Sequence, residues 1–134
     1  MIEYVEALAS SDNRNRGRVL VAALEALGIA PTFQVCRWLR IKNIIVDFSP
    51  DTEAEKLLFS AHYDAIKSCP GANDNASGVA VLLGLCRELK HSHAPVRIVF
   101  FDREEAWLRT PVLRLGLLGS LYYVWKTDLR NIAA

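Results

Sequence analysis

The chain has 134 residues, of which 51% are hydrophobic and 23% are charged, and its formal net charge is +1. A chain of this length folds as one domain that can bury roughly two thirds of its unfolded surface without disulfides. The near-zero charge and the lack of a basic block argue against a nucleic-acid partner. No segment reaches the roughly 18 consecutive apolar residues that a membrane-spanning helix needs, so no membrane partner is expected.

The cysteines and the N-terminus bear on the compartment. Cys36, Cys69 and Cys86 are odd in number and follow no repeating interval, which favours reduced thiols over a disulfide framework. The segment from Met1 to Tyr4 has neither a basic start nor an unbroken apolar run, so no secretory signal is visible. We therefore expect a cytoplasmic protein, although a secreted protein whose signal had been removed would have the same sequence.

The first half of the chain predicts a helix and a hairpin. Residues 14–28 place their apolar side chains on one helical stripe, and Gly28 ends it. Three residues could cap its start: Ser10, Ser11 and Asp12. Residues 32–38 and 41–48 are rich in β-branched side chains, and the short gap between them permits only a hairpin.

A strand, a helix and a second strand follow. Residues 57–61 are short and apolar on both faces, which is typical of a central strand covered on two sides. Residues 75–90 repeat apolar side chains at helical steps, and residues 96–101 form another apolar strand. A strand, helix and strand in this order make the two strands parallel. The predicted fold class is α/β, a three-layer α/β/α sandwich with a mixed, mostly parallel sheet.

The last part of the chain predicts one more helix, over residues 113–129. Its apolar side is expected to consist of Leu115, Leu118, Tyr122 and Trp125. No internal repeat, linker or low-complexity segment interrupts the sequence. We therefore expect residues 1–134 to form a single domain.

Polar side chains follow both buried strands. His62 and Asp64 come after the first strand, Glu104 and Glu105 follow the second, and Asp74 opens the connecting helix. Ligands of open α/β sheets bind beyond the carboxyl ends of the parallel strands, so these groups should share one rim. One imidazole and two carboxylates around an open position are the ligands of a catalytic zinc site. The sequence therefore predicts a metal site of His62, Asp74 and Glu105, with zinc expected and cobalt or manganese also compatible.

Two neighbouring acids receive supporting roles. Asp64 can accept the imidazole N–H of His62 that does not face the metal, which fixes the tautomer. Glu104 is the predicted general base, which takes a proton from metal-activated water as that water attacks a carbonyl. Neighbours in a strand point to opposite faces, so the chain must leave the extended conformation for Glu104 and Glu105 to share a site. Taken singly, each group has a simpler explanation, such as a surface histidine or a solvated glutamate pair, but their joint occurrence at two strand ends favours a site.

Four motifs carry a resemblance to a known family. They are HYD at 62–64, GANDNASG at 71–78, FFDREEAW at 100–107 and LGLLGS at 115–120. Together they resemble the co-catalytic zinc aminopeptidases, a superfamily that includes glutamate carboxypeptidases and glutaminyl cyclases. The resemblance covers about residues 55–125, and the order of its motifs is highly specific.

The resemblance implies a role for each candidate residue. His62 and Glu105 would bind one zinc, and Asp74 would bridge this zinc to a second. Glu104 would be the catalytic base, and Asp64 the acid that supports the histidine. The family also implies a non-proline cis peptide bond directly after Asp74.

The sequence departs from the family pattern in two places. Residues 109–114 lengthen the segment between the glutamates and LGLLGS. Family members also continue beyond residue 134 and supply an acidic ligand from the next strand and a final histidine, whereas this chain stops where that strand should begin. We therefore expect a C-terminally truncated domain that is complete for one zinc and lacks ligands for the second. His91 and His93 do not replace them, since they should face solvent at the opposite rim.

The predicted function is a metal-dependent aminopeptidase that hydrolyses N-terminal residues of peptides, with the activity of these 134 residues alone left open. One alternative is a glutaminyl cyclase-like acyltransferase, which FFDREEAW favours but His62 and the intact Ser77-Gly78 favour less. The other is a non-catalytic peptidase-like domain that binds proteins. Besides a peptide substrate, a second copy of the chain is an expected partner, because an exposed sheet edge recruits strands.

Overall fold

A computed structural model describes residues 1–51, 53–105, 108–109 and 114–133, with the backbone alone at 108–109 and 114–115. Five strands form one sheet in the order β1-β2-β4-β3-β7. Their bounds are Thr32–Cys36 for β1, Ile41–Asp47 for β2, Lys56–His62 for β3, Val96–Phe101 for β4 and Ile132–Ala133 for β7. A separate antiparallel pair joins β5 (Leu108–Arg109) and β6 (Arg114–Leu115).

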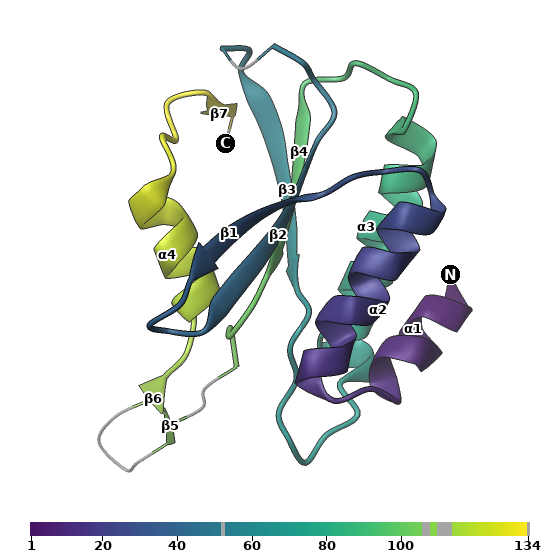
Figure 1. The fold of residues 1–134 in the computed structure, drawn as a ribbon, viewed down its shortest axis with the longest axis vertical. Coiled ribbons are helices and arrows are strands. Elements are labelled where there is room, and N and C mark those ends of the chain that lie inside the picture. The colour runs from purple at the N-terminus through teal and green to yellow at the C-terminus, as the bar shows by residue number, and fades with distance from the viewer. Residues whose placement is uncertain (52, 106–107, 110–113, 134) are drawn as a thin grey trace.

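Helices cover the sheet from both sides, which gives the predicted three layers (Figure 1). On one side lie α1 (Ile2–Ala9), α2 (Asn13–Ala26) and α3 (Ser77–Leu89), and on the other lies α4 (Leu118–Lys126). A short π-helical turn, η1 (Ala72–Ala76), leads into α3. Within the described residues, no helix is long and apolar enough to cross a bilayer.

The expected helix of the first half is present as α2. The Asp12 side chain accepts the Asn15 N–H at 2.9 Å and so caps its start, and Gly28 beyond its end has a φ of 78°. The preceding helix α1, which the sequence pattern did not predict, packs against α2, α3 and η1. Its Leu8 is fully buried in the core.

The strand pairing brings the site residues to one rim of the sheet. β1 and β2 form the expected antiparallel hairpin, and β2 also pairs antiparallel with β4. β3 and β4 are parallel neighbours, in a register that runs from Leu57 opposite Val96 to His62 opposite Phe101. The chain therefore leaves both strands at the same edge, as the strand–helix–strand pattern predicted.

The main core lies between the sheet and helices α1 to α3. Each large apolar side chain buried there contributes roughly 1.5–3 kcal/mol relative to an exposed position. Its fully buried members come from the helices and from the sheet, and they include Leu20, Leu24, Val79, Leu83, Ile98 and Phe100. This packing fixes the ends of β3 and β4 relative to the start of α3.

The expectation that β3 is covered on both faces is wrong. Leu57 is 51% exposed and Phe59 is 41% exposed, although both lie on the same face as the buried Ala61. Neither side chain belongs to the buried core that the sheet forms with α1 to α3, and both keep a large part of their surface open to solvent. The start of β3 therefore presents an apolar surface.

The prediction of a helix over residues 113–129 is also wrong, both in where the helix starts and in which of its faces is buried. Residues 110–113 lie outside the described part, and residues 114–115 form β6. The helix begins only at Leu118, because Leu117 has a φ of 58° and its N–H donates to the Glu104 carbonyl at 3.0 Å. The residues that α4 buries are Gly119 and Tyr123, whereas Trp125 is 72% exposed. The position of the Leu115 side chain lies outside the described part.

The next strand of the sheet has already begun at the end of the chain, contrary to expectation. β7 pairs parallel with β3, with Ile132 opposite Lys56 and Ala133 opposite Leu57. Within the described residues, the five-stranded sheet thus has one more strand than the sequence pattern indicated. This strand protects only the first part of the β3 edge.

Candidate metal centre

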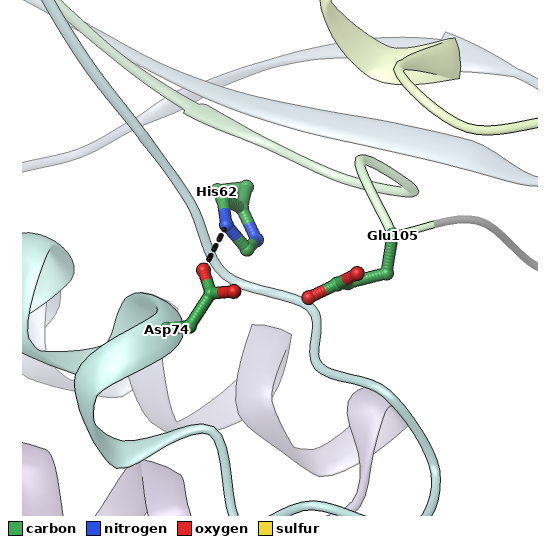
Figure 2. Close-up of side chains that lie close together, drawn as sticks. All are labelled: His62, Asp74 and Glu105. Atoms are coloured by element: carbon green, nitrogen blue, oxygen red, sulfur yellow. Dashed lines mark hydrogen bonds and ion pairs between the residues drawn. The ribbon is translucent and has the colours of Figure 1, made fainter.

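Three predicted ligands meet at the rim where β3 and β4 end. His62, Asp74 and Glu105 each offer one ligand atom, and these atoms all lie within 4.8 Å of one another. Figure 2 shows the three side chains converging from the end of β3, from η1 and from the turn after β4. Asp74 follows His62 by 12 positions in the sequence, and Glu105 follows Asp74 by 31. The three residues are nevertheless neighbours in space, as the topology predicted.

His62 is held through both of its ring nitrogens. Its Nε2 lies 3.0 Å from Asp74 Oδ1, and its Nδ1 lies 3.1 Å from the Asp64 carbonyl oxygen and 3.4 Å from Asp64 Oδ1. Burial lowers the pKa of His62, but the hydrogen bonds and charge of Asp64 and Asp74 outweigh it and raise the pKa to about 9. The imidazole is therefore oriented by the acid predicted to support it.

Asp64 has a second task that its spacing from His62 did not reveal. One carboxylate oxygen accepts the Glu104 N–H at 3.1 Å, and the other accepts the Glu105 N–H at 3.0 Å. The preceding residue, Arg103, has a φ of 54°, so the chain does leave the extended conformation here. Asp64, which is only 4% exposed, thus joins the end of β3 to the turn that carries both glutamates.

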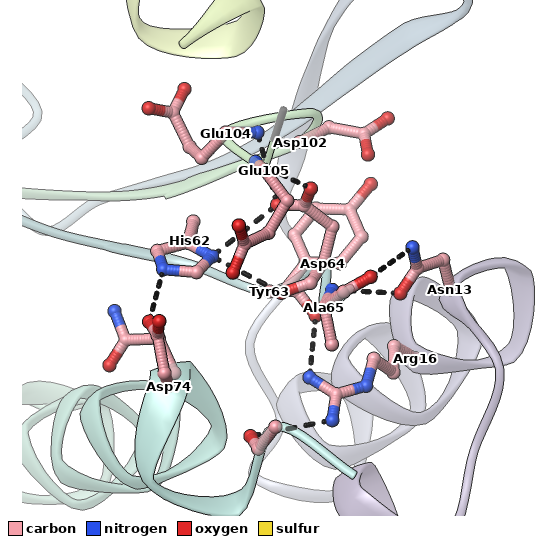
Figure 3. Close-up of polar contacts among 12 residues, drawn as sticks. Asn13, Arg16, His62, Tyr63, Asp64, Ala65, Asp74, Asp102, Glu104 and Glu105 are labelled. Atoms are coloured by element: carbon pink, nitrogen blue, oxygen red, sulfur yellow. Dashed lines mark hydrogen bonds and ion pairs between the residues drawn. The ribbon is translucent and has the colours of Figure 1, made fainter. Parts of the chain in front are cut away.

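Glu104 lies beside the three-residue cluster rather than within it. Its carboxylate accepts the Ser120 N–H at 2.7 Å and the Ser120 hydroxyl at 3.0 Å, at the start of α4. Burial raises the pKa of Glu104, while the two hydrogen bonds from Ser120 oppose this effect. Figure 3 shows its carboxylate pointing away from His62 and Asp74, so its role as the base stays a prediction.

Asp74 stands on a backbone that only certain residues can form. The Asp74–Asn75 peptide bond is cis, which confirms the prediction made from the family resemblance. Gly71 has a φ of 60°, and a Cβ at this position would lie 2.7 Å from the Ala65 Cβ and 2.8 Å from the Asp74 carbonyl oxygen. Asn75 accepts the Gly78 N–H at 3.2 Å through its side chain and so continues the turn into α3.

Two residues of α2 that the sequence analysis did not single out fix the loop after β3. Asn13 donates to the Ala65 carbonyl and accepts the Ala65 N–H, each at 2.8 Å. Arg16 is 1% exposed and donates to the carbonyls of Tyr63 and Pro70 (Figure 3). A signal for Arg16 was available, because it lies four residues before Leu20 on the apolar stripe of its helix.

The donor set fits zinc. Zinc takes imidazole nitrogen and carboxylate oxygen as ligands, and a catalytic site holds three protein ligands and an open position. His62, Asp74 and Glu105 supply this combination. Asp64 adds the carboxylate behind the histidine that zinc-binding histidines usually have.

Comparison with known proteins identifies the family. The family model described as Peptidase family M28 matches residues 43–134, which include all five predicted site residues. The chain belongs to peptidase family M28. The motif resemblance is thereby confirmed.

Curated relatives of this M28 chain include aminopeptidases. It is 45% identical over 67 residues to Aminopeptidase YwaD of Bacillus subtilis, an alignment that covers 48% of the chain and 13% of that protein. It is 30% identical over 90 residues to Aminopeptidase Y of Saccharomyces cerevisiae, covering 66% of the chain and 15% of that protein. The M28 chain thus spans about an eighth to a seventh of the length of these two relatives.

Solved structures of two kinds resemble the M28 chain. The zinc aminopeptidase BSAP from Bacillus subtilis is 36% identical, with a TM-score of 0.56, over 68% of this chain and 22% of that one. The glutaminyl cyclase of Porphyromonas gingivalis is 25% identical, with a TM-score of 0.76, over 96% of this chain and 55% of that one. The predicted fold class, a mixed sheet between helical layers, is confirmed by these neighbours.

Proposed function

We propose that this M28 chain carries the zinc-binding rim of an aminopeptidase, which hydrolyses the N-terminal residues of peptides. The single observation that carries the proposal is the convergence of His62, Asp74 and Glu105, whose ligand atoms lie within 4.8 Å of one another. Family M28 and the aminopeptidase relatives support the same activity. They also support a peptide as the substrate.

Each site residue has a proposed role. His62, Asp74 and Glu105 would hold one zinc, which when bound acts as a Lewis acid toward a carbonyl oxygen and lowers the pKa of water. Glu104 would accept a proton from the attacking water, and burial raises its pKa, which makes the carboxylate a stronger base. Asp64 would fix the imidazole and the backbone of both glutamates through the contacts given above.

A second zinc would need ligands besides Asp74. The described residues contain one cluster of histidine, cysteine and acidic side chains that could hold a metal ion. His91 and His93 are exposed in the loop between α3 and β4, as expected. We therefore propose that the 134 residues bind one zinc with full protein ligation.

Metal binding tests the proposal directly. We expect the protein reconstituted with zinc to retain about one zinc per chain after dialysis, measured by mass spectrometry of the metal. His62→Ala should lose this zinc, whereas His93→Ala should keep it. A chain that retains no zinc after dialysis would instead support the non-catalytic, protein-binding alternative.

Activity tests the reaction and the base. An aminopeptidase assay would compare this chain with a version extended at its C-terminus, each with and without Glu104→Gln. Loss of the proton acceptor should lower kcat by roughly 10²-fold or more. If an active form is insensitive to Glu104→Gln, the proposed base is wrong.

A glutaminyl cyclase-like acyltransferase is the second candidate. The observation that favours it is the likeness to the Porphyromonas gingivalis glutaminyl cyclase, which covers 96% of this chain. A peptide with N-terminal glutamine separates the two functions. An aminopeptidase releases free glutamine from it, whereas a cyclase releases ammonia.

A further inference from the structure

A cavity of about 620 Å³ adjoins the candidate metal centre. It shares two side chains with the site, because Asp64 and Glu105 line both. Its other walls come from the start of α2, the turn between β1 and β2, the loop after β3 and the turn after β4. In Figure 3, Asn13 and Ala65 of this cavity lie on the side of Glu105 away from Asp74.

Four cationic side chains surround this cavity: Arg14, Arg40, Lys67 and Arg103. They come from four different segments, so their proximity reflects the fold and not a basic run in the sequence. Arg103 Nε donates to the Arg40 carbonyl at 3.0 Å, which draws the two arginine positions together. In the described part of the chain, no carboxylate oxygen lies within 4.0 Å of a charged nitrogen of these four residues.

The carboxylates of the cavity already have other partners. Asp64 accepts the two glutamate N–H groups, and Asp102 accepts the Lys42 N–H at 3.0 Å. Glu105 belongs to the proposed zinc ligands, so a cation would neutralise it there. The charge of Arg103 acts on the neighbouring Asp102, so Arg14, Arg40 and Lys67 are the cations of this cavity that have no close carboxylate among the described residues. The lining holds four cations against three carboxylates, and a zinc ion would neutralise Glu105, so the remaining positive charge favours an anionic ligand.

We propose that this cavity binds a carboxylate of the peptide substrate close to the bond that is cleaved. The inference rests on the proposed aminopeptidase function, and it adds a preference for anionic substrates. A carboxylate suits the site because arginine guanidinium groups bind it through two parallel hydrogen bonds. The carboxylate has three sources in a dipeptide: the free C-terminus, an acidic side chain after the cleaved bond, or an acidic N-terminal side chain.

Four dipeptides distinguish these sources. The neutral reference is Leu-Gln-amide, and the three anionic probes are Leu-Gln with a free C-terminus, Leu-Glu-amide and Glu-Gln-amide. We expect the zinc-loaded protein to show a kcat/KM roughly tenfold higher or more for at least one anionic probe, as suits a charge-assisted hydrogen bond. The probe that shows the preference identifies the source.

Variants connect the preference to the cavity. Arg40→Gln, Arg103→Gln and Lys67→Gln should each bring the ratio of anionic to neutral kcat/KM closer to one. Lys67 is exposed, so its variant tests the proposal even if an arginine variant fails to fold. Arg37→Gln is the matched control, because Arg37 is exposed in the same turn as Arg40 but does not line the cavity. It should keep the ratio of the wild type.

The outcomes separate this proposal from the proposed function. Equal turnover of neutral and anionic dipeptides would overturn the carboxylate site while leaving the aminopeptidase intact. Absence of turnover by this chain would leave the aminopeptidase function to the extended version, and calorimetric titration of N-acetyl-Leu-Gln-amide against N-acetyl-Leu-Gln, N-acetyl-Leu-Glu-amide and N-acetyl-Glu-Gln-amide would then decide the site. Tighter binding of any of the three acids, lost in Lys67→Gln, supports the site, and equal binding of all four compounds overturns it.

Discussion

Arg16 shows how one buried charge can hold a functional loop. Its guanidinium donates to the Tyr63 carbonyl at 3.2 Å, to the Pro70 carbonyl and to the Gly71 carbonyl at 3.4 Å. These carbonyls lie at the two ends of the loop between β3 and η1, so Arg16 closes the loop that separates His62 from Asp74. Burial lowers the pKa of Arg16, while the charge of Asp64 opposes this effect.

Replacing Arg16 by methionine should therefore destabilise the protein. Methionine fills much of the space but leaves three carbonyls of the loop without their donor, at a cost of about 3 kcal/mol in the free energy of unfolding. Urea denaturation measures this change, and zinc titration should show weaker binding. Arg18→Met, an exposed position of the same helix, should change stability by less than about 0.5 kcal/mol. Equal losses in both variants would contradict the role given to Arg16.

The three cysteines should differ in reactivity for a physical reason. Cys86 is fully buried in the core, and burial raises the pKa of its thiol to about 12. The thiolate is the reactive form, so at pH 8 Cys86 is almost entirely unreactive. Iodoacetamide at pH 8 should label the exposed Cys69 and leave Cys86 unlabelled in the folded protein. Mass spectrometry of the labelled peptides checks this, and denaturant should make both residues reactive.

At the scale of elements, α4 depends on a close contact at Gly119. A Cβ at this position would overlap the Asp102 carbonyl oxygen and lie 2.8 Å from Asn43 Oδ1. Asn43 is fully buried and donates to the Gly119 carbonyl at 2.9 Å, which fixes the start of α4 against β2. The same helix start holds Glu104 through Ser120, so the docking of α4 bears on the site.

Gly119→Ala should push α4 away from the sheet. We expect a loss of roughly 1–3 kcal/mol in the free energy of unfolding, as is usual when a well-packed contact is overfilled. Gly84→Ala is the matched control inside α3, where the Cβ would meet only the flexible Met1 side chain at 3.1 Å. That change should be neutral or stabilising, because alanine favours helices more than glycine does. Thermal unfolding of the two variants would reveal an equal response if Gly119 were an ordinary helix position.

The elements that the sequence predicted well are those with a strong local pattern. The hairpin of β1 and β2 and the parallel pair of β3 and β4 follow from runs of β-branched and apolar residues around a helical repeat. The start of α4 was misplaced because the apolar period continues through residues that pair as β6. Hydrogen bonds from the backbone of Leu117 and Leu118 to the turn after β4 decide where that helix begins, and such long-range contacts leave no periodicity.

The ligands of the candidate site could be predicted from the sequence, but the residues that support them could not. His62, Asp74 and Glu105 could be brought together because strand ends and a helix start define one rim. The roles of Asn13 and Ser120 could not be predicted, because Asn13 contacts a backbone group and Ser120 a side chain that are distant in the sequence. The cationic cavity was equally hidden, because its four charged residues come from four separate segments.

At the scale of the whole molecule, the sheet is unevenly covered. β7 pairs with β3 only at Lys56 and Leu57, so within the described residues the rest of this edge has no strand beside it. Leu57 and Phe59 expose apolar surface along the same strand. An unprotected edge with apolar side chains is a template for pairing with another chain. The self-association expected from the sequence therefore stays a prediction, now with a defined position.

Two copies should associate through β3. Because pairing depends on concentration, the weight-average mass measured by light scattering should rise above that of the 15.0 kDa chain as the protein is concentrated. Phe59→Lys places a charge on the edge and should reduce the association, since strand edges carrying lysine resist pairing. Trp38→Lys is the control, because Trp38 is 96% exposed but lies in the turn between β1 and β2. A stable monomer at high concentration, or a loss of association in Trp38→Lys alone, would show that the β3 edge is not a contact between copies.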